Sequence, residues 1–267
     1  MSQFKDGILT GKVALITGGG SGLGAGIARR FAAQGARVAL LGRTSEKLEA
    51  TAATIRAAGG EALCVAADVR DYAAVDEAVR RTVTTFGALD LLVCSAAGNF
   101  LAPAATLSAN GFRTVVDIDL CGTFNACRAA YAALATRKGA ILHITATQAF
   151  VPTPLQCHAG AAKAGIEKLT RDLALEWAGS GVRVNALAPG PIDDTEGMRR
   201  LAPGDMAATM RRAVPLGRFG TIDEIADAAL FLCSPAASWI TGTTLVIDGG
   251  TALAGGARFL ELLAPTS

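Results

Sequence analysis

The sequence predicts an α/β protein: a single doubly wound domain over residues 1–267, with a seven-stranded parallel sheet and helices on both of its faces. Short apolar runs bounded by glycine alternate along the whole chain with longer segments that have the apolar period of a helix. The runs are apolar at consecutive positions, which is typical of strands buried on both faces of a parallel sheet. No linker, low-complexity tract or charge run divides the 267 residues.

Seven strands and the helices between them are expected in strict alternation. The strands are KVALIT (12–17), RVALLG (37–42), ALCVAADV (62–69), LDLLVCSAA (89–97), GAILHIT (139–145), VRVNALAPG (182–190) and TTLVIDGG (243–250). The helices are 23–35, 45–60, 73–87, a long one around 110–137 and one that carries Lys163. Segment 191–215 breaks the pattern because it is polar at first and contains Pro, Gly and Met. We expect it to be a mobile insert on the substrate side, near the carboxyl ends of the strands.

Composition excludes several classes of protein. Hydrophobic residues make up 51% of the chain, and the net charge is +2 with no basic block. Nucleic acid and anionic membrane surfaces are therefore not expected partners, and no apolar run has the length of a membrane span. The six cysteines form no C-x-x-C pair and only two histidines are present, so we expect no metal site. Free cysteines and the absence of a signal peptide favour a cytoplasmic location.

A glycine loop follows the first expected strand and opens the first expected helix. It reads TGGGSGLG (17–24), and its glycines let the backbone approach a pyrophosphate at the positive end of the helix. Its place in a series of strand–helix–strand units favours a Rossmann-like dinucleotide site over the alternative, a purely structural turn. The residues expected to hold the cofactor here are Gly18, Ser21, Gly22, Leu23 and Gly24.

The end of the second expected strand selects the cofactor. A preference for NAD usually shows as an acidic residue there, but this chain has Gly42 and Arg43. A guanidinium suits a 2′-phosphate, so NADP(H) is favoured, and a solvated surface arginine is the alternative. Asp68 and Val69 end the third strand where an adenine edge would lie, although Asp68 could equally cap the next helix.

The motifs together resemble the short-chain dehydrogenase/reductase family over nearly the whole chain. They are TGGGSGLG, ADV (67–69), CSAAG (94–98), VRVNALAPG and VIDGG (246–250). The resemblance implies a nicotinamide cofactor, the strand order 3-2-1-4-5-6-7 and a homotetramer. It also implies cofactor contacts at Ala96, Pro189, Gly190 and Ile192.

The usual catalytic residues of that family are mostly replaced. The family has Asn, Ser, Tyr and Lys, and only the lysine remains, as Lys163. The tyrosine position is Ala159, the serine position is Ala146 and the asparagine position is Asp119. The chain contains only two tyrosines, and neither lies near these motifs. A member without its tyrosine is either inactive or performs chemistry that needs none.

The replacements resemble one subgroup of the family, the peroxisomal type of 2,4-dienoyl-CoA reductases. The shared strings are CSAAGNFLAP, DIDLCGTFN, ITATQAF, HAGAAKAG and LAPGPIDDTEGMRRL. This resemblance implies NADPH-dependent reduction of an acyl-CoA substrate, with Asp119 and Lys163 as the catalytic residues. Hydride addition to a conjugated thioester gives a delocalised enolate, which a water held by these two residues could protonate. The rivals are a reductase of another enoyl or ketoacyl thioester and a non-catalytic NADP(H)-binding protein.

Four further residues are expected near the substrate. Asn99 and Phe100 follow the fourth strand, and Thr147 follows the fifth. Asp248 ends the seventh strand and either borders the acyl group or caps a turn. Asp119 likewise has an alternative role as a turn residue that bonds backbone amides.

Overall fold

The computed structural model describes residues 4–195 and 206–254, and its centre is a parallel sheet of seven strands. The strand order is β3-β2-β1-β4-β5-β6-β7, as predicted. The strands are β1 (Val13–Thr17), β2 (Arg37–Gly42), β3 (Ala62–Ala66), β4 (Leu91–Cys94), β5 (Ala140–Ile144), β6 (Arg183–Pro189) and β7 (Thr244–Ile247). Every neighbouring pair runs parallel, so all seven carboxyl ends lie at one edge of the sheet.

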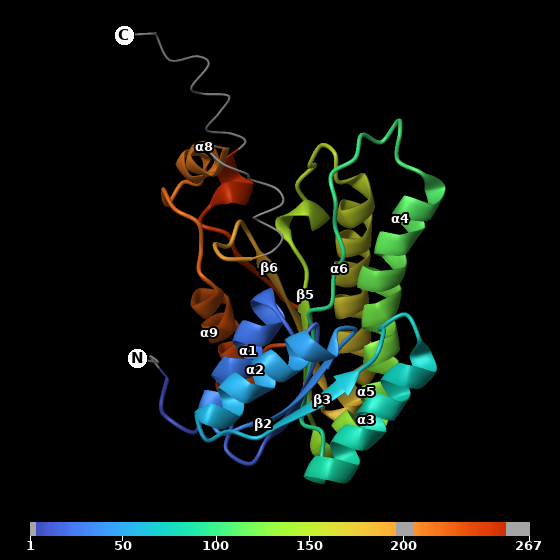
Figure 1. Cartoon of the computed structure of the whole chain (residues 1–267), viewed down its shortest axis with the longest axis vertical. Helices are drawn as coiled ribbons and strands as arrows, with labels where there is room; N and C mark the ends of the chain where they lie inside the picture. Colours follow the sequence, from blue (N-terminus) through green and yellow to red (C-terminus); the bar gives the residue numbers. More distant parts are fainter. Residues whose placement is uncertain (1–3, 196–205, 255–267) are drawn as a thin grey trace.

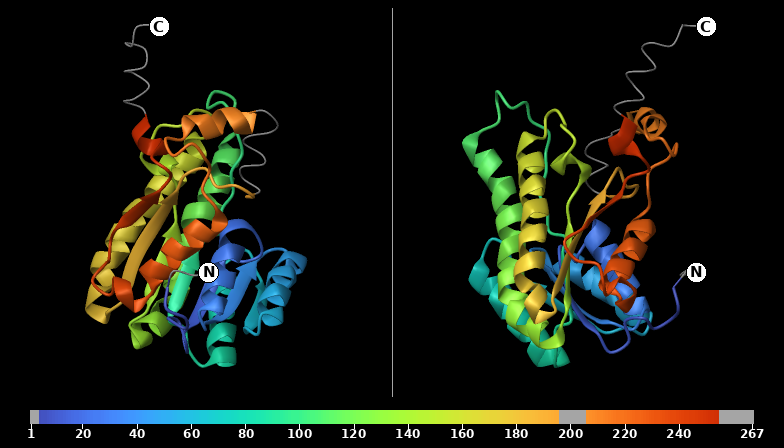
Figure 2. Two further views of the ribbon diagram at one scale, coloured as in Figure 1. Left: turned by 90° about the vertical axis from the view of Figure 1, so that its left-hand side faces the viewer. Right: turned by 180° about the vertical axis from the view of Figure 1, so that it is seen from behind.

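Helices cover both faces of this sheet (Figures 1 and 2). One face packs against α1 (Gly22–Ala33), α2 (Ser45–Ala57) and α9 (Ile222–Cys233). The other packs against α3 (Tyr72–Phe86), α5 (Gly122–Arg137) and α6 (Cys157–Trp177). The chain also forms α4 (Ala109–Val116), the π-helical turn η1 (Asp117–Cys121), the 3-10 turn η2 (Thr147–Ala149) and α8 (Met206–Ala213), with further 3-10 turns at η3 (Ala178–Ser180), η4 (Pro235–Ala237) and η5 (Thr251–Leu253). Among the described residues, no helix is long and apolar enough to cross a membrane.

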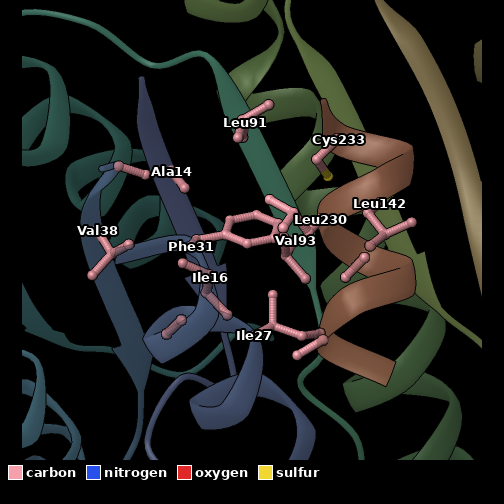
Figure 3. Packing of buried hydrophobic residues seen from close by; sticks show 14 of the residues in the cluster. Ala14, Ile16, Ile27, Phe31, Val38, Leu91, Val93, Leu142, Leu230 and Cys233 are labelled. Carbon is pink, nitrogen blue, oxygen red and sulfur yellow. The ribbon is translucent and has the colours of Figure 1, made fainter. Parts of the chain in front are cut away.

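The core has two halves because successive side chains of a strand point to opposite faces. In β1, Ala14 and Ile16 join the cluster under α1 and α9, whereas Val13 and Leu15 join the cluster under α3 and α5. Figure 3 shows the first cluster, in which Phe31 of α1 lies among strand residues and Leu230 of α9. This explains why the strands read as unbroken apolar runs.

Three strands end three residues earlier than the sequence predicts, and one of them is the seventh, which ends at Ile247 rather than at residue 250. The third ends at Ala66 rather than at residue 69, because Asp71 N–H bonds to the carbonyl of Asp68 and starts a turn. The fourth ends at Cys94 rather than at residue 97. There, the backbone N–H groups of Ser95 and Ala96 donate to the side-chain oxygen of Thr17, at 3.1 and 3.2 Å, instead of pairing with a neighbouring strand.

The long helix expected around 110–137 is present, but it is interrupted by the π-helical turn η1. A π turn holds one residue more than an α turn, so it shifts the direction of the side chains that follow, and such turns occur frequently at functional sites. Here the turn contains Asp119, which is 1% exposed, whereas Asp117 at its start is half-buried. The insert near 191–215 contains α8, and its residues 196–205 lie outside the described part of the chain.

Candidate active site

The glycine loop forms a tight turn between β1 and α1 that requires glycine at several positions. Gly18 and Gly22 have φ angles of +69° and +52°, a region that favours glycine. A Cβ atom on Gly24 would lie 2.3 Å from the carbonyl oxygen of Gly18. Ser21 precedes the helix and makes no capping bond with its side chain. The turn therefore leaves a backbone cradle at a helix N-terminus, which suits the pyrophosphate of a dinucleotide, and the half-buried Leu23 packs against the core beneath it.

The polar groups expected near the adenosine gather beyond β2 and β3. Arg43 is exposed directly after β2, and its charge helps to lower the pKa of Asp68, although the hydrogen bond from Arg70 is the larger cause. Arg70 binds Asp68 in a fork, with its Nη2 atom 2.6 Å from Oδ2. The alternative role of Asp68 as a helix cap is wrong, because Asp71 caps α3 through a bond from Ala74 N–H.

The other residues expected at the cofactor come from the same edge of the sheet. Val69 is buried against α5, where a Cβ atom on Gly122 would lie 2.6 Å from its Cγ2 atom. Pro189 ends β6, and the N–H of Gly190 donates to Ile247 at 3.0 Å. A Cβ atom on Gly190 would lie 2.6 Å from the Cβ of Asp248, so β7 passes too closely for a side chain there. The following loop turns back at Ile192, which forms a β-bridge with Gly220.

Asp119 and Lys163 form a buried ion pair. Nζ of Lys163 lies 3.1 Å from Oδ2 of Asp119 and donates to the carbonyl oxygen of Ile144 at 3.1 Å. Oδ1 of Asp119 accepts the N–H of Gly98 at 2.7 Å. The side chains are 10% and 1% exposed, respectively. Each charge would be costly to bury alone, and the pair with its added hydrogen bonds offsets that cost.

The hydroxyl groups that usually surround such a lysine are missing here. Ala159 is 3% exposed on the first turns of α6, and Ala146 is half-buried after β5. Thr145 donates to the carbonyl oxygen of Lys163 at 3.3 Å, which satisfies a backbone group. Thr147 is half-buried at the start of η2.

Neither tyrosine lies at the ion pair. Tyr131 bonds to Ser180 at 2.8 Å and packs against Trp177, and Tyr72 bonds to Arg128 on the outside of α3 and α5. The structure thus presents one acid–lysine pair and no phenol beside it, among the described residues.

Three consecutive residues after β4 contact the elements around this pair. Gly98 donates to Asp119, Asn99 donates through Nδ2 to Oε1 of Gln156 at 2.6 Å, and the ring of Phe100 lies 4.5 Å from that of His158. Asn99 is half-buried, whereas Phe100 is 43% exposed. The loop therefore places both expected substrate residues next to the N-terminus of α6.

Asp248 is held as a turn residue. Its Oδ1 accepts the N–H of Gly250 at 2.8 Å and its Oδ2 accepts that of Ala252 at 2.7 Å. It also borders a cavity of about 550 Å³, together with Pro191, Ile192 and Phe231. Asp119 and Lys163 do not line this cavity, so its size alone does not identify the site of chemistry.

The structure contains a cluster of two thiols and an imidazole that the sequence did not predict. Nε2 of His143 lies 3.1 Å from Sγ of Cys127, its Nδ1 lies 2.8 Å from the hydroxyl of Thr170, and Cys94 adjoins both. The ligand atoms of the two cysteines and the histidine lie within 4.8 Å of one another, although hydrogen bonds already partner them. The residues come from three separate elements, so no sequence motif marks them, and the expectation of no metal site rested on the absence of a C-x-x-C pair and on the small number of histidines.

Contact with the Cys127 thiol lowers the pKa of the Cys94 thiol to about 6, whereas burial raises the pKa of Cys127 well above its usual range.

Comparisons with known proteins agree with this arrangement. A family model described as enoyl-(acyl carrier protein) reductase matches residues 18–252. A peroxisomal 2,4-dienoyl-CoA reductase of Arabidopsis thaliana, named as (3E)-enoyl-CoA-producing, is 43% identical over 259 residues, which cover 93% of this chain and 87% of that protein. A probable 2,4-dienoyl-CoA reductase of Bacillus subtilis, named as (2E)-enoyl-CoA-producing, is 43% identical over 90% of this chain and 96% of that protein.

Solved structures agree as well. The structure of a citronellol catabolism dehydrogenase of Pseudomonas aeruginosa has a TM-score of 0.84 and 38% identity, over 94% of this chain and 99% of that one. The glycine turn, the strand order and the lysine of α6 fit the same conclusion, and they imply a nicotinamide cofactor. The chain belongs to the short-chain dehydrogenase/reductase family of oxidoreductases.

Proposed function

We propose that this chain is an NADPH-dependent 2,4-dienoyl-CoA reductase that forms trans-3-enoyl-CoA in the degradation of unsaturated fatty acids. The observation that carries the proposal is the buried pair of Asp119 and Lys163 beside two alanines, Ala146 and Ala159, that replace the family's hydroxyl donors. A ketone reductase needs a proton donor at the carbonyl oxygen, and a conjugated thioester does not, because its enolate is finally protonated on carbon. Two similar proteins are named as 2,4-dienoyl-CoA reductases, which supports the same substrate class.

NADPH would lie across the carboxyl edge of the sheet, held by the glycine turn at its pyrophosphate and by Arg43 at its 2′-phosphate. When bound there, it supplies a hydride to the δ-carbon of the dienoyl thioester. The chain's own task is then to keep water away from the reacting atoms except for one molecule and to deliver a single proton. Lys163 would also bond the ribose, since its ammonium has three hydrogens and only two acceptors are seen among the described residues.

Asp119 and Lys163 would hold that one water at the α-carbon. The delocalised electrons of the dienolate form a C–H bond at the α-carbon, and the double bond comes to lie between the β- and γ-carbons. The proton leaves the water, and the hydroxide is stabilised by the Lys163 ammonium until a proton from bulk solvent replaces the one lost. Asp119 accepts from the water and orients it, and the Gly98 N–H fixes the carboxylate in turn.

The position of the double bond in the product distinguishes two outcomes. The Arabidopsis relative is named as a (3E)-enoyl producer and the Bacillus relative as a (2E)-enoyl producer. Protonation at the α-carbon gives the 3-enoyl product, whereas protonation at the γ-carbon gives the 2-enoyl product. We favour the first, because a water held by Asp119 would lie beside the loop that carries Asn99 and Phe100, where we expect the thioester end.

The test is NADPH oxidation with dienoyl-CoA, enoyl-CoA and ketoacyl-CoA side by side, followed by proton NMR of the product. Turnover of dienoyl-CoA alone, with vinyl protons at the β- and γ-carbons, is the expected result. Turnover of ketoacyl-CoA instead would contradict the proposal, and tight NADPH binding without any turnover would favour a non-catalytic binder. A homotetramer and a cytoplasmic location accompany the proposal and are checked by light scattering and by cell fractionation.

A further inference from the structure

Buried polar atoms without a partner gather beside the proposed active site. Among the described residues these include Oδ1 of Asn99 and both ring nitrogens, Nδ1 and Nε2, of His158. His158 is 0% exposed and is the second residue of α6, the helix that carries Lys163. The Asp119–Lys163 pair does not use any of these three atoms.

Contacts on either side hold the cluster in place. Oε1 of Gln156 accepts from Nδ2 of Asn99 at 2.6 Å and from Nε2 of Gln148 at 3.3 Å, so the loop after β4 and the loop between β5 and α6 meet at this one oxygen. The Phe100 ring covers His158 with a centroid distance of 4.5 Å. The N–H of Ala102 donates to Leu155 at 2.9 Å and ties the same two loops further out.

If packing is its only role, an imidazole at this position destabilises the fold, because its ring nitrogens are buried without hydrogen bonds. A phenyl ring would stack on Phe100 equally well and would bury no polar atom without a hydrogen bond. The Asn99 amide could likewise face the other way only by giving up its bond to Gln156. The arrangement is therefore explained by a polar group that enters the cluster in the working enzyme.

The missing bonds define the chemistry of that group. Oδ1 of Asn99 needs a donor, and a neutral imidazole offers one N–H that needs an acceptor. A secondary amide has one N–H and one C=O, so it satisfies both. In an acyl-CoA, an amide of this kind lies two methylene groups beyond the thioester sulfur.

We infer that Asn99 and His158 form a subsite for this first amide of the thiol carrier, an inference that rests on the proposed dienoyl-CoA substrate. The bond between Gly98 and Asp119 fixes one end of the loop where the α-carbon of the substrate would lie. Asn99 is the next residue, and consecutive Cα atoms are about 3.8 Å apart, so the subsite lies one step further toward the carrier. The ring of Phe100 lies 4.5 Å from that of His158 and Phe100 is 43% exposed, so the cluster adjoins the surface from which the carrier arm would enter.

Three dienoyl thioesters with the same acyl group test this subsite in the full-length protein with NADPH. They are the CoA ester, the N-acetylcysteamine ester, which keeps only the first amide, and the S-ethyl ester, which has none. The wild type should show a kcat/KM about tenfold higher for the N-acetylcysteamine ester than for the S-ethyl ester, as one or two hydrogen bonds allow. His158→Phe keeps the stack on Phe100 and should bring that ratio close to one.

A second variant and a control separate recognition from damage to the fold. His158→Gln keeps a donor and an acceptor and should restore part of the ratio, which a merely structural role of the imidazole would not do. Cys157→Ala changes the exposed neighbour and should keep the ratio of the wild type. NADPH affinity, followed by fluorescence, verifies that each variant retains its cofactor site.

The results that overturn the inference differ from those that overturn the proposed function. Equal kcat/KM values for the N-acetylcysteamine and S-ethyl esters in the wild type, or an unchanged ratio in His158→Phe, would show that water or another residue partners these atoms. Absence of turnover with all three thioesters would instead overturn the proposed function, and with it the substrate on which the subsite depends.

Discussion

The ammonium of Lys163 lies 3.1 Å from the carboxylate of Asp119, and the same ammonium binds the carbonyl oxygen of Ile144 at the end of β5. One side chain of α6 thus connects the π turn between α4 and α5 with the sheet edge. The buried lysine has an anionic partner, and the buried aspartate has a cationic one, so neither charge is left uncompensated. We therefore expect chemistry at this place to depend on both residues together.

Asp119→Asn should lower turnover of dienoyl-CoA by about 10²–10⁴-fold at saturating NADPH, the usual range for the loss of acid–base assistance. The amide keeps the shape of the side chain but removes the charge that orients the water. The dissociation constant for NADPH should change little. Asp117→Asn, in the same π turn, is the matched control and should stay close to the wild type. If Asp119→Asn retained a rate near that of the wild type, Asp119 would have only a structural role in the turn.

Lys163→Met should destabilise the fold as well as slow the reaction. It leaves the Asp119 carboxylate buried without its cation, which typically costs about 3–5 kcal/mol, so Tm should fall by roughly 10 °C. Its KM for NADPH should also rise. The double variant Asp119→Asn/Lys163→Met should recover much of the lost stability and be little slower than the slower single variant. Additive losses in a thermal melt and in kcat would mean that the two residues act independently.

Arg43→Ala should erase most of the preference for NADPH over NADH. A charge-assisted phosphate contact contributes about 1.5–3 kcal/mol, so the wild type should favour NADPH by about tenfold or more. Calorimetric titration of both cofactors measures the ratio, and Arg81→Ala, an exposed arginine on α3, serves as the control. Equal affinities of the wild type for the two cofactors would contradict the assignment of NADP(H).

Ala159→Tyr should not speed up reduction of dienoyl-CoA, although it restores the residue that the family usually has there. Ala159 is 3% exposed, so a phenol at this position must displace its neighbours, and overpacking typically costs about 1–3 kcal/mol. Ala161→Tyr, at an exposed position of the same helix, should leave the rate unchanged. A faster rate in Ala159→Tyr would indicate that the reaction requires a phenolic acid.

Acid should weaken the N-terminal cap of α9, where Glu224 binds Arg218 and Thr221. Hydrogen bonds from Arg218 and from the backbone of Thr221 hold the pKa of Glu224 at about 2, below its ordinary value of 4.5. Because the folded protein favours the carboxylate, this contribution to stability is complete above pH 4.5 and is lost as the pH falls toward 2. Glu224→Gln should therefore lower Tm at pH 6 but differ less from the wild type at pH 3. An equal difference at both pH values would contradict this linkage.

The sequence by itself determined the elements of this fold and the loss of the family's usual tyrosine. Apolar runs such as VALIT and RVALLG specify strands locally, because a parallel strand buried on both faces is apolar at every position. The glycine turn is equally local, since the φ angle of Gly18 and the close contact at Gly24 exclude other residues. The replacement of the family's usual tyrosine by Ala159 can be recognised from the sequence alone.

Only the tertiary structure decided how side chains from separate elements meet. Strand β4 ends early because the N–H groups of Ser95 and Ala96 donate to the side-chain oxygen of Thr17. The sequence pattern within 89–97 does not predict this bond, because its acceptor belongs to β1. The π turn buries Asp119 rather than Asp117, and His158 and Asn99 are left with buried polar atoms lacking partners among the described residues. Periodicity in a sequence reports which face of a helix or strand is buried, whereas a hydrogen bond depends on distances of about 3 Å between atoms far apart along the chain. The strands could therefore be predicted, and the contacts of the candidate site required the fold.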